Sequence, residues 1–471
     1  MNEDLNQILK ARRQKLGLLA ERGIQPFAYR YERSHHAEAA RALFEEQEDE
    51  GSLDEDGHGS PVRIAGRLKS FRGHGKTAFG HLEDGWGTIQ VYFRRDVLGD
   101  EAFAVLMELV DLGDWLGVEG ALFRTRTGEI TVRATRWDLL TKSLRPLPLG
   151  KTELDSETGE TIIHSGFSDV EARYRQRYAD LAVHPHLRAV FRTRARIIGA
   201  IRDFLDGEGF LEVETPALQP LYGGASARPF VTLHNALDRT MYLRIADELY
   251  LKRLVVGGFE RVYEIAKDFR NEGIDRFHNP EFTMLEFYQA FADYRDMMDQ
   301  VERLLVYVSD QALGSRNAAF QGEEISFEPP FRRIRLLDAL GEALGEDPLV
   351  LSEEELRDRA YRLRLSDLEG AGKGKLLDKL FEALVQGELV QPTFVTDYPR
   401  ELSPLAKPHR DHPPLTERFE LFVAGQEVAN AFSELNDPVD QRRRFEEQAA
   451  LRARGDDEAQ QVDEDLSLIH I

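Results

Sequence analysis

Apolar residues near the start of the chain recur at the spacing of an amphipathic helix. The positions that carry this pattern are Leu5, Ile8, Leu9, Leu16 and Leu19. The pattern ends by about Gly23, and an acidic stretch rich in Gly, Asp and Ser then continues to Ser60. Such a composition predicts a linker or a flexible loop. Residues 1–60 are therefore expected to form an N-terminal helix followed by an acidic linker.

Short stretches of alternating apolar and polar residues occupy residues 61–142. Five such stretches are separated by turns that contain glycine, a pattern typical of consecutive short strands. Five short strands suit a small closed barrel, and the OB-fold is a barrel of this kind. We therefore predict an OB-fold over residues 61–142.

The rest of the chain alternates helical and strand patterns. A Pro-rich joint and a polar insertion make residues 143–184 an expected linker, and residues 185–471 are expected to form one large domain. Within it, residues from about 331 to 390 are charged and mostly helical in pattern. The predicted class is α+β, with an N-terminal β-barrel and an antiparallel sheet flanked by helices.

Polar residues alternate with apolar ones inside three predicted strands of this domain. Arg270 and Glu272 share the parity of one strand face. The second strand has Phe282, Met284, Glu286 and Tyr288 on one face, and the third has Asn430, Phe432 and Glu434. Buried carboxylates are costly unless a cation compensates them. Several acids beside an arginine therefore indicate a cationic ligand, a divalent metal or both, although spacing alone also allows a lattice of structural salt bridges.

Composition narrows the functional classes. The chain has 471 residues, a formal net charge of −23 and no cysteine. Disulfides, thiolate nucleophiles and thiolate zinc sites are therefore excluded. No apolar run reaches the length of a membrane span, and the start lacks the pattern of a secretory signal, so a cytoplasmic location is expected. The acidic balance argues against a non-specific nucleic-acid coat but leaves a specific RNA contact open.

One face of the predicted barrel has the chemistry of an RNA-binding surface. Ile89, Val91 and Phe93 alternate toward the interior, so Gln90 is expected on the outer face, and Phe79 points outward from the preceding strand. An aromatic ring beside an amide on an OB-fold face can stack on a base and hydrogen-bond to it.

Several segments resemble a known family. Residues 209–218 (GFLEVETPAL) and 268–288 (DFRNEGIDRFHNPEFTMLEFY) are similar to the first two motifs of class II aminoacyl-tRNA synthetases. Residues 222–230, 242–273, 396–407 and 419–438 resemble, more narrowly, the bacterial-type class II lysyl-tRNA synthetases. The resemblance implies a six-stranded antiparallel sheet, ATP-dependent activation of lysine to lysyl-adenylate, and transfer of lysine to the 3′ end of tRNA(Lys). It also implies Mg²⁺ as a cofactor and a homodimer.

The same resemblance assigns roles to individual residues. Arg270 is implied as the catalytic clamp on lysine and ATP. The implied ATP-binding residues are Arg270, Glu272, His278, Asn279 and Phe282, and the metal ligands are Glu420 and Glu427. The implied lysine-binding residues are Gly224, Glu248, Glu286, Tyr288, Asn430, Phe432 and Glu434. The implied anticodon-binding residues are Arg72, Phe79 and Gln90. Glu427 has the wrong parity to share a simple strand face with Asn430, so this assignment requires a bulge.

Other functions remain open at this point. The chain could be an aspartyl- or asparaginyl-type tRNA ligase, an enzyme that lysylates a translation factor, or a non-catalytic RNA-binding relative. An amine substrate is favoured because Glu434 and Tyr288 suit an ammonium group. No Gly-rich segment with an Asp-Arg pair follows residues 432–438, although the family normally has such a third motif. We therefore expect an incomplete C-terminal end and weak lysine activation by the chain as given.

Overall fold

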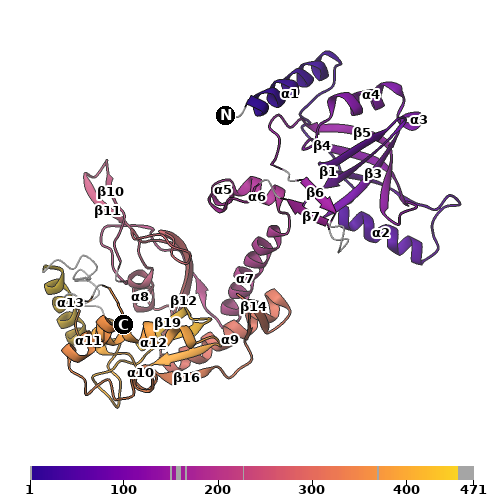
Figure 1. Cartoon of the computed structure of the whole chain (residues 1–471). Helices are drawn as coiled ribbons and strands as arrows, with labels where there is room; N and C mark the ends of the chain where they lie inside the picture. Colours follow the sequence, from indigo (N-terminus) through magenta and orange to yellow (C-terminus); the bar gives the residue numbers. More distant parts are fainter. Residues whose placement is uncertain are drawn as a thin grey trace. The chain divides into compact units, whose positions relative to one another are not determined.

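The computed structural model describes residues 3–148, 151–154, 161–164, 167–225, 227–366, 368 and 371–453. The chain divides into two compact units, residues 1–188 and 189–471 (Figure 1). Each unit is described by itself below. No helix in the described ranges has the length and apolar character needed to cross a membrane.

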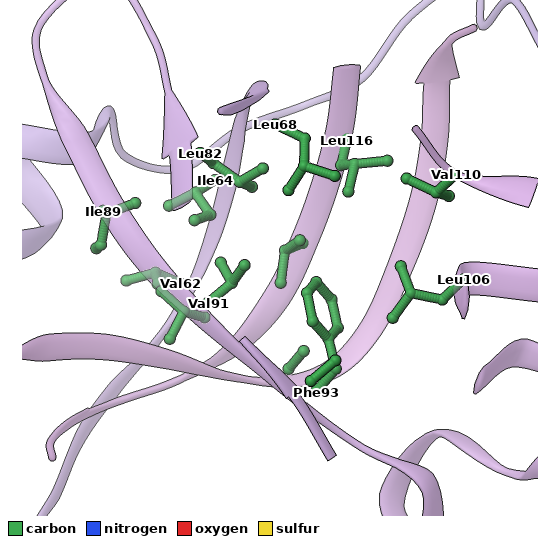
Figure 2. Close-up of a cluster of buried hydrophobic side chains, with 14 of the residues drawn as sticks. Val62, Ile64, Leu68, Leu82, Ile89, Val91, Phe93, Leu106, Val110 and Leu116 are labelled. Carbon is green, nitrogen blue, oxygen red and sulfur yellow. The ribbon is translucent and has the colours of Figure 1, made fainter. Parts of the chain in front are cut away.

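A closed five-stranded barrel forms the centre of the first unit. Its strands are β1 (His58–His74), β2 (Thr77–Glu83), β3 (Thr88–Arg94), β4 (Trp115–Arg124) and β5 (Ile130–Thr141), joined in the order β1-β2-β3-β5-β4. The five strands expected from the sequence are therefore confirmed. Alternate side chains fill the interior, as Figure 2 shows for Val91, Phe93 and Leu116.

The segment before the barrel is not the linker that its acidic composition predicts. After α1 (Glu3–Glu21), residues Ala37–Asp49 form helix α2, whose Ala37, Ala40 and Phe44 are buried in the barrel core. The ring of His36 caps this helix by accepting a hydrogen bond from the Ala39 amide at 3.1 Å. The prediction was wrong because the acidic residues mask the three- and four-residue spacing of the apolar positions. Those acids occupy the solvent face of the helix.

Helices between and after the barrel strands complete the first unit, and the last of them leads into the second. The helices are α3 (Arg95–Leu98), α4 (Asp100–Leu109), α5 (Val170–Arg175), α6 (Arg177–Val183) and α7 (Leu187–Gly207). The expected polar insertion lies partly outside the described residues. Its described parts are two antiparallel strands, β6 (Lys151–Leu154) and β7 (Thr161–His164).

The strands of the second unit form separate small sheets in the described residues rather than one six-stranded sheet. The hairpin of β12 (Arg261–Phe269) and β13 (Glu281–Gln289) pairs in parallel with β8 (Leu211–Glu212). A four-stranded sheet has the order β16 (Arg332–Arg335), β17 (Thr393–Thr396), β18 (Arg418–Val423) and β19 (Gln426–Phe432). The remaining strands are β9 (Leu218–Gln219), β10 (Val231–His234), β11 (Arg239–Leu243), β14 (Asn317–Phe320) and β15 (Glu323–Ser326).

Helices cover both faces of the four-stranded sheet. Helix α9 (Tyr294–Leu313) packs its apolar side against Phe394 and Phe419. On the opposite face, α10 (Leu336–Leu344) and α12 (Lys373–Leu384) pack against Val395 and Phe422. Adjacent residues of one strand point to opposite faces, so both sides of β17 are apolar, as expected for a fully buried strand.

The charged helical insertion has a core of its own. Helices α10, α11 (Glu353–Arg362) and α12 share buried leucines, among them Leu340, Leu356 and Leu376. Residues 332–335, expected to be helical, instead form strand β16, which pairs in parallel with β17. The remaining helices of this unit are α8 (Glu248–Val256) and α13 (Pro438–Ala453).

The buried position of α2 generates a prediction about stability. Replacing Phe44 with alanine removes a fully buried ring and should lower the free energy of unfolding by about 3–5 kcal/mol. Denaturant unfolding of the full chain measures this loss. Glu46→Ala, on the exposed side of the same helix, is the matched control and should change stability little. A Phe44→Ala variant as stable as this control would mean that α2 is not part of the barrel core.

Candidate active site

The β12–β13 hairpin forms the floor of the candidate site. Glu264 lies opposite Glu286, and Asp268 lies opposite Phe282, so all four side chains share one face. On the same face, the Tyr288 hydroxyl donates a hydrogen bond to Glu286 Oε2 at 3.1 Å. The sequence placed Glu286 and Tyr288 on this face but overlooked Glu264 and Asp268. The signal was present, because both residues have the parity of Arg270.

Arg270 lies just beyond the strand, not within it. Strand β12 ends at Phe269, and the Arg270 amide donates to the Pro280 carbonyl at 2.9 Å, where the hairpin loop closes. The Arg270 guanidinium lies over the Phe282 ring, 5.0 Å from its centroid, and its Nε donates to the Ile245 carbonyl. Glu272 is exposed in the loop. The expectation that Arg270 and Glu272 share a strand face is therefore wrong, because the ladder has already ended.

The loop that carries His278 and Asn279 is ordered by its own hydrogen bonds. Asp275, which sequence reasoning missed, accepts from the amides of Phe277 and His278 at 2.7 Å each and pairs with His278 Nδ1 at 2.7 Å. The Phe277 amide, together with His278, lowers the pKa of Asp275 to about 2. Asn279 Nδ2 donates to the Glu281 carbonyl. The side chains of His278 and Asn279, both predicted to bind ATP, are thus exposed on a loop that its own hydrogen bonds stabilise.

Gly224 and Glu248 lie directly against each other. Gly224 has a φ of +91°, and a Cβ at this position would lie 2.9 Å from the Glu248 Cβ, so the contact needs glycine. Glu248 Oε2 lies 3.5 Å from the same point. Glu248 is buried at the start of α8. The structure therefore brings together the two positions predicted to bind the substrate's α-ammonium group.

Lys252, which sequence reasoning missed, connects two of the predicted lysine-binding residues. Its Nζ lies 2.5 Å from Glu248 Oε1 and 2.7 Å from Glu434 Oε2, and 5.3 Å from the centroid of Phe432. Burial alone would lower the pKa of Lys252, but Glu248 and Glu434 reverse this effect and raise it. The signal was its position four residues after Glu248 in a helix whose neighbouring residues are apolar.

Behind these residues lies a buried cluster of charged groups around Arg244. The guanidinium of Arg244 lies 3.0 Å from Asp247 Oδ1, 2.8 Å from Glu264 Oε1 and 3.4 Å from Asp268 Oδ1. The Asp247 amide donates to Glu286 Oε1 at 3.1 Å, which links the cluster to the floor. Carboxyl oxygens of Asp247, Asp268 and Glu286 lie within 4.8 Å of one another. Arg244 thus pairs with three acids, and Glu286 lies beside them as a fourth.

This crowding changes the protonation of the acids. Burial, followed by the charges of Asp268 and Glu286, raises the pKa of Asp247 to about 9. Burial and the neighbouring Glu248 raise the pKa of Glu286 to about 8. In the part of the chain that the structure describes, no oxygen of Asp247 or Asp268 accepts a hydrogen bond from another group. We infer that the two carboxyl groups share a proton at neutral pH.

Glu420, Glu427 and Asn430 meet on the four-stranded sheet because β19 contains a bulge. Leu421 pairs with Ala429 whereas Phe422 pairs with Glu427, so Val428 is the extra residue. The bulge corrects the parity of Glu427, as its assignment required. Glu420 accepts from the Tyr398 hydroxyl at 2.8 Å and lies 2.5 Å from Arg418.

The predicted RNA-binding residues lie on adjacent barrel strands. Arg72 on β1 is directly opposite Phe79 on β2, and Phe79 is opposite Tyr92 on β3. The rings of Phe79 and Tyr92 are stacked with centroids 4.5 Å apart, so Phe79 is half-buried rather than isolated. Gln90 accepts from the Thr131 hydroxyl at 2.8 Å and donates to Glu129 at 2.6 Å. This pairing fixes the orientation of the amide.

Comparison with known proteins gives consistent matches over both units. Residues 169–468 match the family model of tRNA synthetases class II (D, K and N), and residues 62–140 match that of the OB-fold nucleic acid binding domain. The chain is 50% identical to the lysine–tRNA ligase of Pelotomaculum thermopropionicum, a match that covers 98% of this chain and 87% of that protein.

Other relatives carry the same name. The lysine–tRNA ligase of Carboxydothermus hydrogenoformans is 49% identical, with 98% of this chain and 90% of that protein covered. The lysine–tRNA ligase of Oceanobacillus iheyensis is 47% identical, with 99% and 91% covered. The similarity therefore extends through the barrel and the candidate site alike.

The shared proton of Asp247 generates a prediction about pH. A carboxyl group with a raised pKa in the folded chain holds its proton there after the unfolded chain has lost it. Stability should therefore fall as pH rises between about 4 and 9, by at most about 1.4 kcal/mol per pH unit. Asp247→Asn keeps the shape without the charge, so it should stabilise the chain increasingly from pH 6 to pH 9. Denaturant unfolding of both chains across this range measures the effect; parallel curves would rule out the shared proton.

Proposed function

Because the chain belongs to the class II tRNA synthetases (D, K and N), we propose that its candidate site activates lysine with ATP and that its barrel binds the tRNA that receives the lysine. Its function is that of a lysine–tRNA ligase, an aminoacyl-tRNA ligase. The observation that carries this proposal is the excess of acids in the site. We place the lysine slot among Glu248, Glu286 and Glu434, because the charge of Glu248 acts on both other carboxyl groups and the three acids suit the two ammonium groups of lysine.

We assign the ends of the lysine molecule to opposite ends of this slot. Glu434 and the Tyr288 hydroxyl would bind the ε-ammonium, and Phe432 would line the slot beside it. Glu248 and the backbone of Gly224 would bind the α-ammonium, with Glu286 close by. Asn430 would orient the carboxylate. Carboxylates are the natural partners of ammonium groups in a site with little water, where unpaired charges are costly.

ATP would bind over the hairpin loop. Arg270 can hold the α-phosphate and the lysine carboxylate together, because its planar fork donates several hydrogen bonds at once. Phe282, which already lies against the Arg270 guanidinium, would stack on the adenine. Glu272 would accept from the adenine amino group. His278 and Asn279, exposed on the hairpin loop, would lie near the terminal phosphates.

The lysine carboxylate is already ionised and nucleophilic, so in the first step the protein would position the reactants and no general base would be needed. An oxygen of the lysine carboxylate attacks the α-phosphorus, the bond from that phosphorus to the bridging oxygen breaks, and pyrophosphate leaves. A terminal ribose hydroxyl of tRNA would next attack the carbonyl carbon, the bond from that carbon to the phosphate oxygen would break, and AMP would leave with the hydroxyl proton passing to its phosphate. Arg270 holds the reacting groups in line and balances the negative charge that builds up on phosphorus.

Glu420 and Glu427 would hold Mg²⁺ together with ATP. Burial and the charge of Glu420 raise the pKa of Glu427 more than Arg418 and Arg270 lower it, so a further cation would stabilise these two neighbouring carboxylates. Hard carboxylate oxygens suit this ion, and the residues present therefore fit it. When bound, the ion would neutralise charge on the phosphates.

The pocket argues against the alternative functions. An aspartyl- or asparaginyl-type ligase needs cationic or amide groups around the substrate side chain, whereas Glu434 and Glu286 are acids. An enzyme that lysylates a translation factor needs no anticodon-binding barrel. Non-catalytic binding is disfavoured because Arg270 and Phe282, which lie against each other, would both contact the nucleotide in the proposed reaction.

We further propose that the enzyme is a cytoplasmic homodimer. Leu211, Leu218, Val231 and Leu233 are exposed apolar residues near the first family motif, which supports an interface there. The proposed reaction as a whole is tested by lysine-dependent exchange of pyrophosphate into ATP and by calorimetric titration of lysine and ATP. A chain that binds neither substrate would refute it.

Replacing Glu434 with glutamine should separate lysine binding from ATP binding. A neutral amide would face the ε-ammonium in a slot with little water, at a cost of about 2–4 kcal/mol in lysine affinity. ATP affinity should stay unchanged, because Glu434 contacts no predicted ATP ligand. Titration calorimetry measures both affinities. Equal losses for lysine and ATP would remove Glu434 from the lysine slot.

Replacing Phe79 with alanine should weaken binding of the anticodon stem-loop. Loss of one stacked base costs about 1–3 kcal/mol, measured by fluorescence anisotropy with a labelled stem-loop. Lysine and ATP affinities should not change. Tyr29→Ala is the matched control, because this aromatic residue is exposed in the same unit but lies outside the barrel strands. If both variants lose the same affinity, the stacking role of Phe79 is wrong.

A further inference from the structure

The ammonium group of Lys252 occupies the space between the two carboxylates assigned to opposite ends of the substrate. Glu248 belongs to helix α8, and Glu434 follows strand β19, so Lys252 connects elements far apart in the sequence. Its side chain is 1% exposed. No other cation of the described residues lies within ion-pair distance of either Glu248 or Glu434. The internal lysine is therefore their shared counter-ion.

Lys252 engages one oxygen of each carboxylate. It holds Glu248 through Oε1, while Oε2 of the same group lies on the side of Gly224. It holds Glu434 through Oε2, which is completely buried. The Glu434 side chain is nevertheless 27% exposed, so the exposed surface belongs to its other atoms. In these ion pairs Lys252 thus holds one oxygen of each carboxylate, Oε1 of Glu248 and Oε2 of Glu434.

An ammonium group that contacts two carboxylates fixes the distance between them. The Lys252 ammonium cannot contact both carboxylates unless they stay at a set separation, and its stem is packed in the interior and cannot follow a large movement. The charge is equally important. Without a cation between them, two neighbouring carboxylates out of water repel each other, and one of them binds a proton.

We propose that Lys252 is a positioning residue that sets the separation and the ionisation of Glu248 and Glu434, and thereby selects an amino acid with two ammonium groups spaced as in lysine. This inference rests on the proposed function of the slot. Lys252 itself is not expected to touch the reacting atoms. Ornithine has the same two ammonium groups with one methylene fewer between them, so it is the amino acid that tests this selection.

The charged groups that face Glu434 allow the effect of pH to be worked out. They are Lys252 and Glu248 on α8, and Tyr288 on β13. Burial raises the pKa of Glu434 to about 7, although Lys252 opposes this shift. Lysine binding needs the ionised carboxylate, so affinity should rise with pH through about 7. Removal of Lys252 takes away the opposing charge and should move this rise to higher pH.

The experiment compares Lys252→Met and Lys252→Arg with the unaltered chain. Titration calorimetry measures the affinities for L-lysine, L-ornithine and ATP from pH 5.5 to pH 9. In Lys252→Met, lysine affinity at pH 7 should fall at least about tenfold, the pH midpoint should rise, and the preference for lysine over ornithine should shrink. ATP affinity should not change. Lys252→Arg keeps the charge, so its pH midpoint should stay near that of the unaltered chain.

Lys142→Met is a matched control from the first unit. Lys142 is also fully buried and bridges two carboxylates, with Nζ 2.5 Å from Asp111 and 2.7 Å from Asp114. Its loss should lower stability without changing the lysine affinity, the pH midpoint or the preference over ornithine. The comparison separates the loss of a buried ion pair in general from the specific effect at the slot.

Two outcomes would overturn the proposal. One is a Lys252→Met chain with the lysine affinity, pH midpoint and ornithine preference of the unaltered chain. The other is an equal loss of lysine and ATP affinity without a change in pH midpoint, which would indicate a purely structural residue. If Lys252→Met does not fold, Lys252→Arg decides, because an altered pH midpoint in that variant contradicts the proposal. Absence of lysine binding by the unaltered chain would instead refute the proposed function.

Discussion

The proposed lysine slot brings together more carboxyl groups than its internal cations can balance. Among the described residues, Arg244 lies within ion-pair distance of Asp247, Glu264 and Asp268, and Lys252 lies within that distance of Glu248 and Glu434. A sixth acid, Glu286, has a carboxyl oxygen within 4.8 Å of those of Asp247 and Asp268. Such an imbalance destabilises the folded chain unless protons or a ligand supply the missing positive charge. Lysine carries two ammonium groups and suits this requirement, whereas an acidic or amide amino acid does not. Binding of lysine would supply the missing positive charge, and the electrostatic stabilisation gained in this way would contribute to substrate affinity.

The fold makes this arrangement possible by bringing three distant segments together. The β12–β13 hairpin supplies the floor, α8 lies against it with Glu248 and Lys252 on one side, and the end of β19 delivers Glu434. The bulge at Val428 then brings Glu427 into line with Asn430 on the same strand. Each of these placements depends on backbone hydrogen bonds or on a close contact such as that of Gly224. The side chains are therefore positioned before a substrate arrives, which is the condition for catalysis by orientation.

The spacing of apolar and polar residues predicted strands and their faces correctly where no second effect interferes with it. The five barrel strands and the shared face of Glu286 and Tyr288 follow from simple alternation. Prediction failed where a second effect overrides the pattern, as at α2, where surface acids mask an apolar stripe, and at Arg270, where the ladder ends one residue earlier. The spacing of four residues could have paired Lys252 with Glu248, but not with Glu434, which lies 182 residues away and is brought close only by the tertiary fold. Asp268 has the parity of Arg270, but only its contact with Arg244 in the folded chain shows that it belongs to the buried cluster.

The two buried clusters, one around Arg244 and one around Lys252, compensate their excess negative charge in different ways. Around Arg244, burial raises the pKa of Asp247 enough that a proton can supply the missing charge, so this cluster stays balanced whether or not substrate is present. Around Lys252, the proposed ligand would bind the same two acids, so a proton there would compete directly with lysine. The first arrangement supports the floor, and the second makes binding selective. A substitution that improved the balance at the second cluster would stabilise the chain and weaken its affinity for lysine, because stability and substrate binding draw on the same unpaired charge.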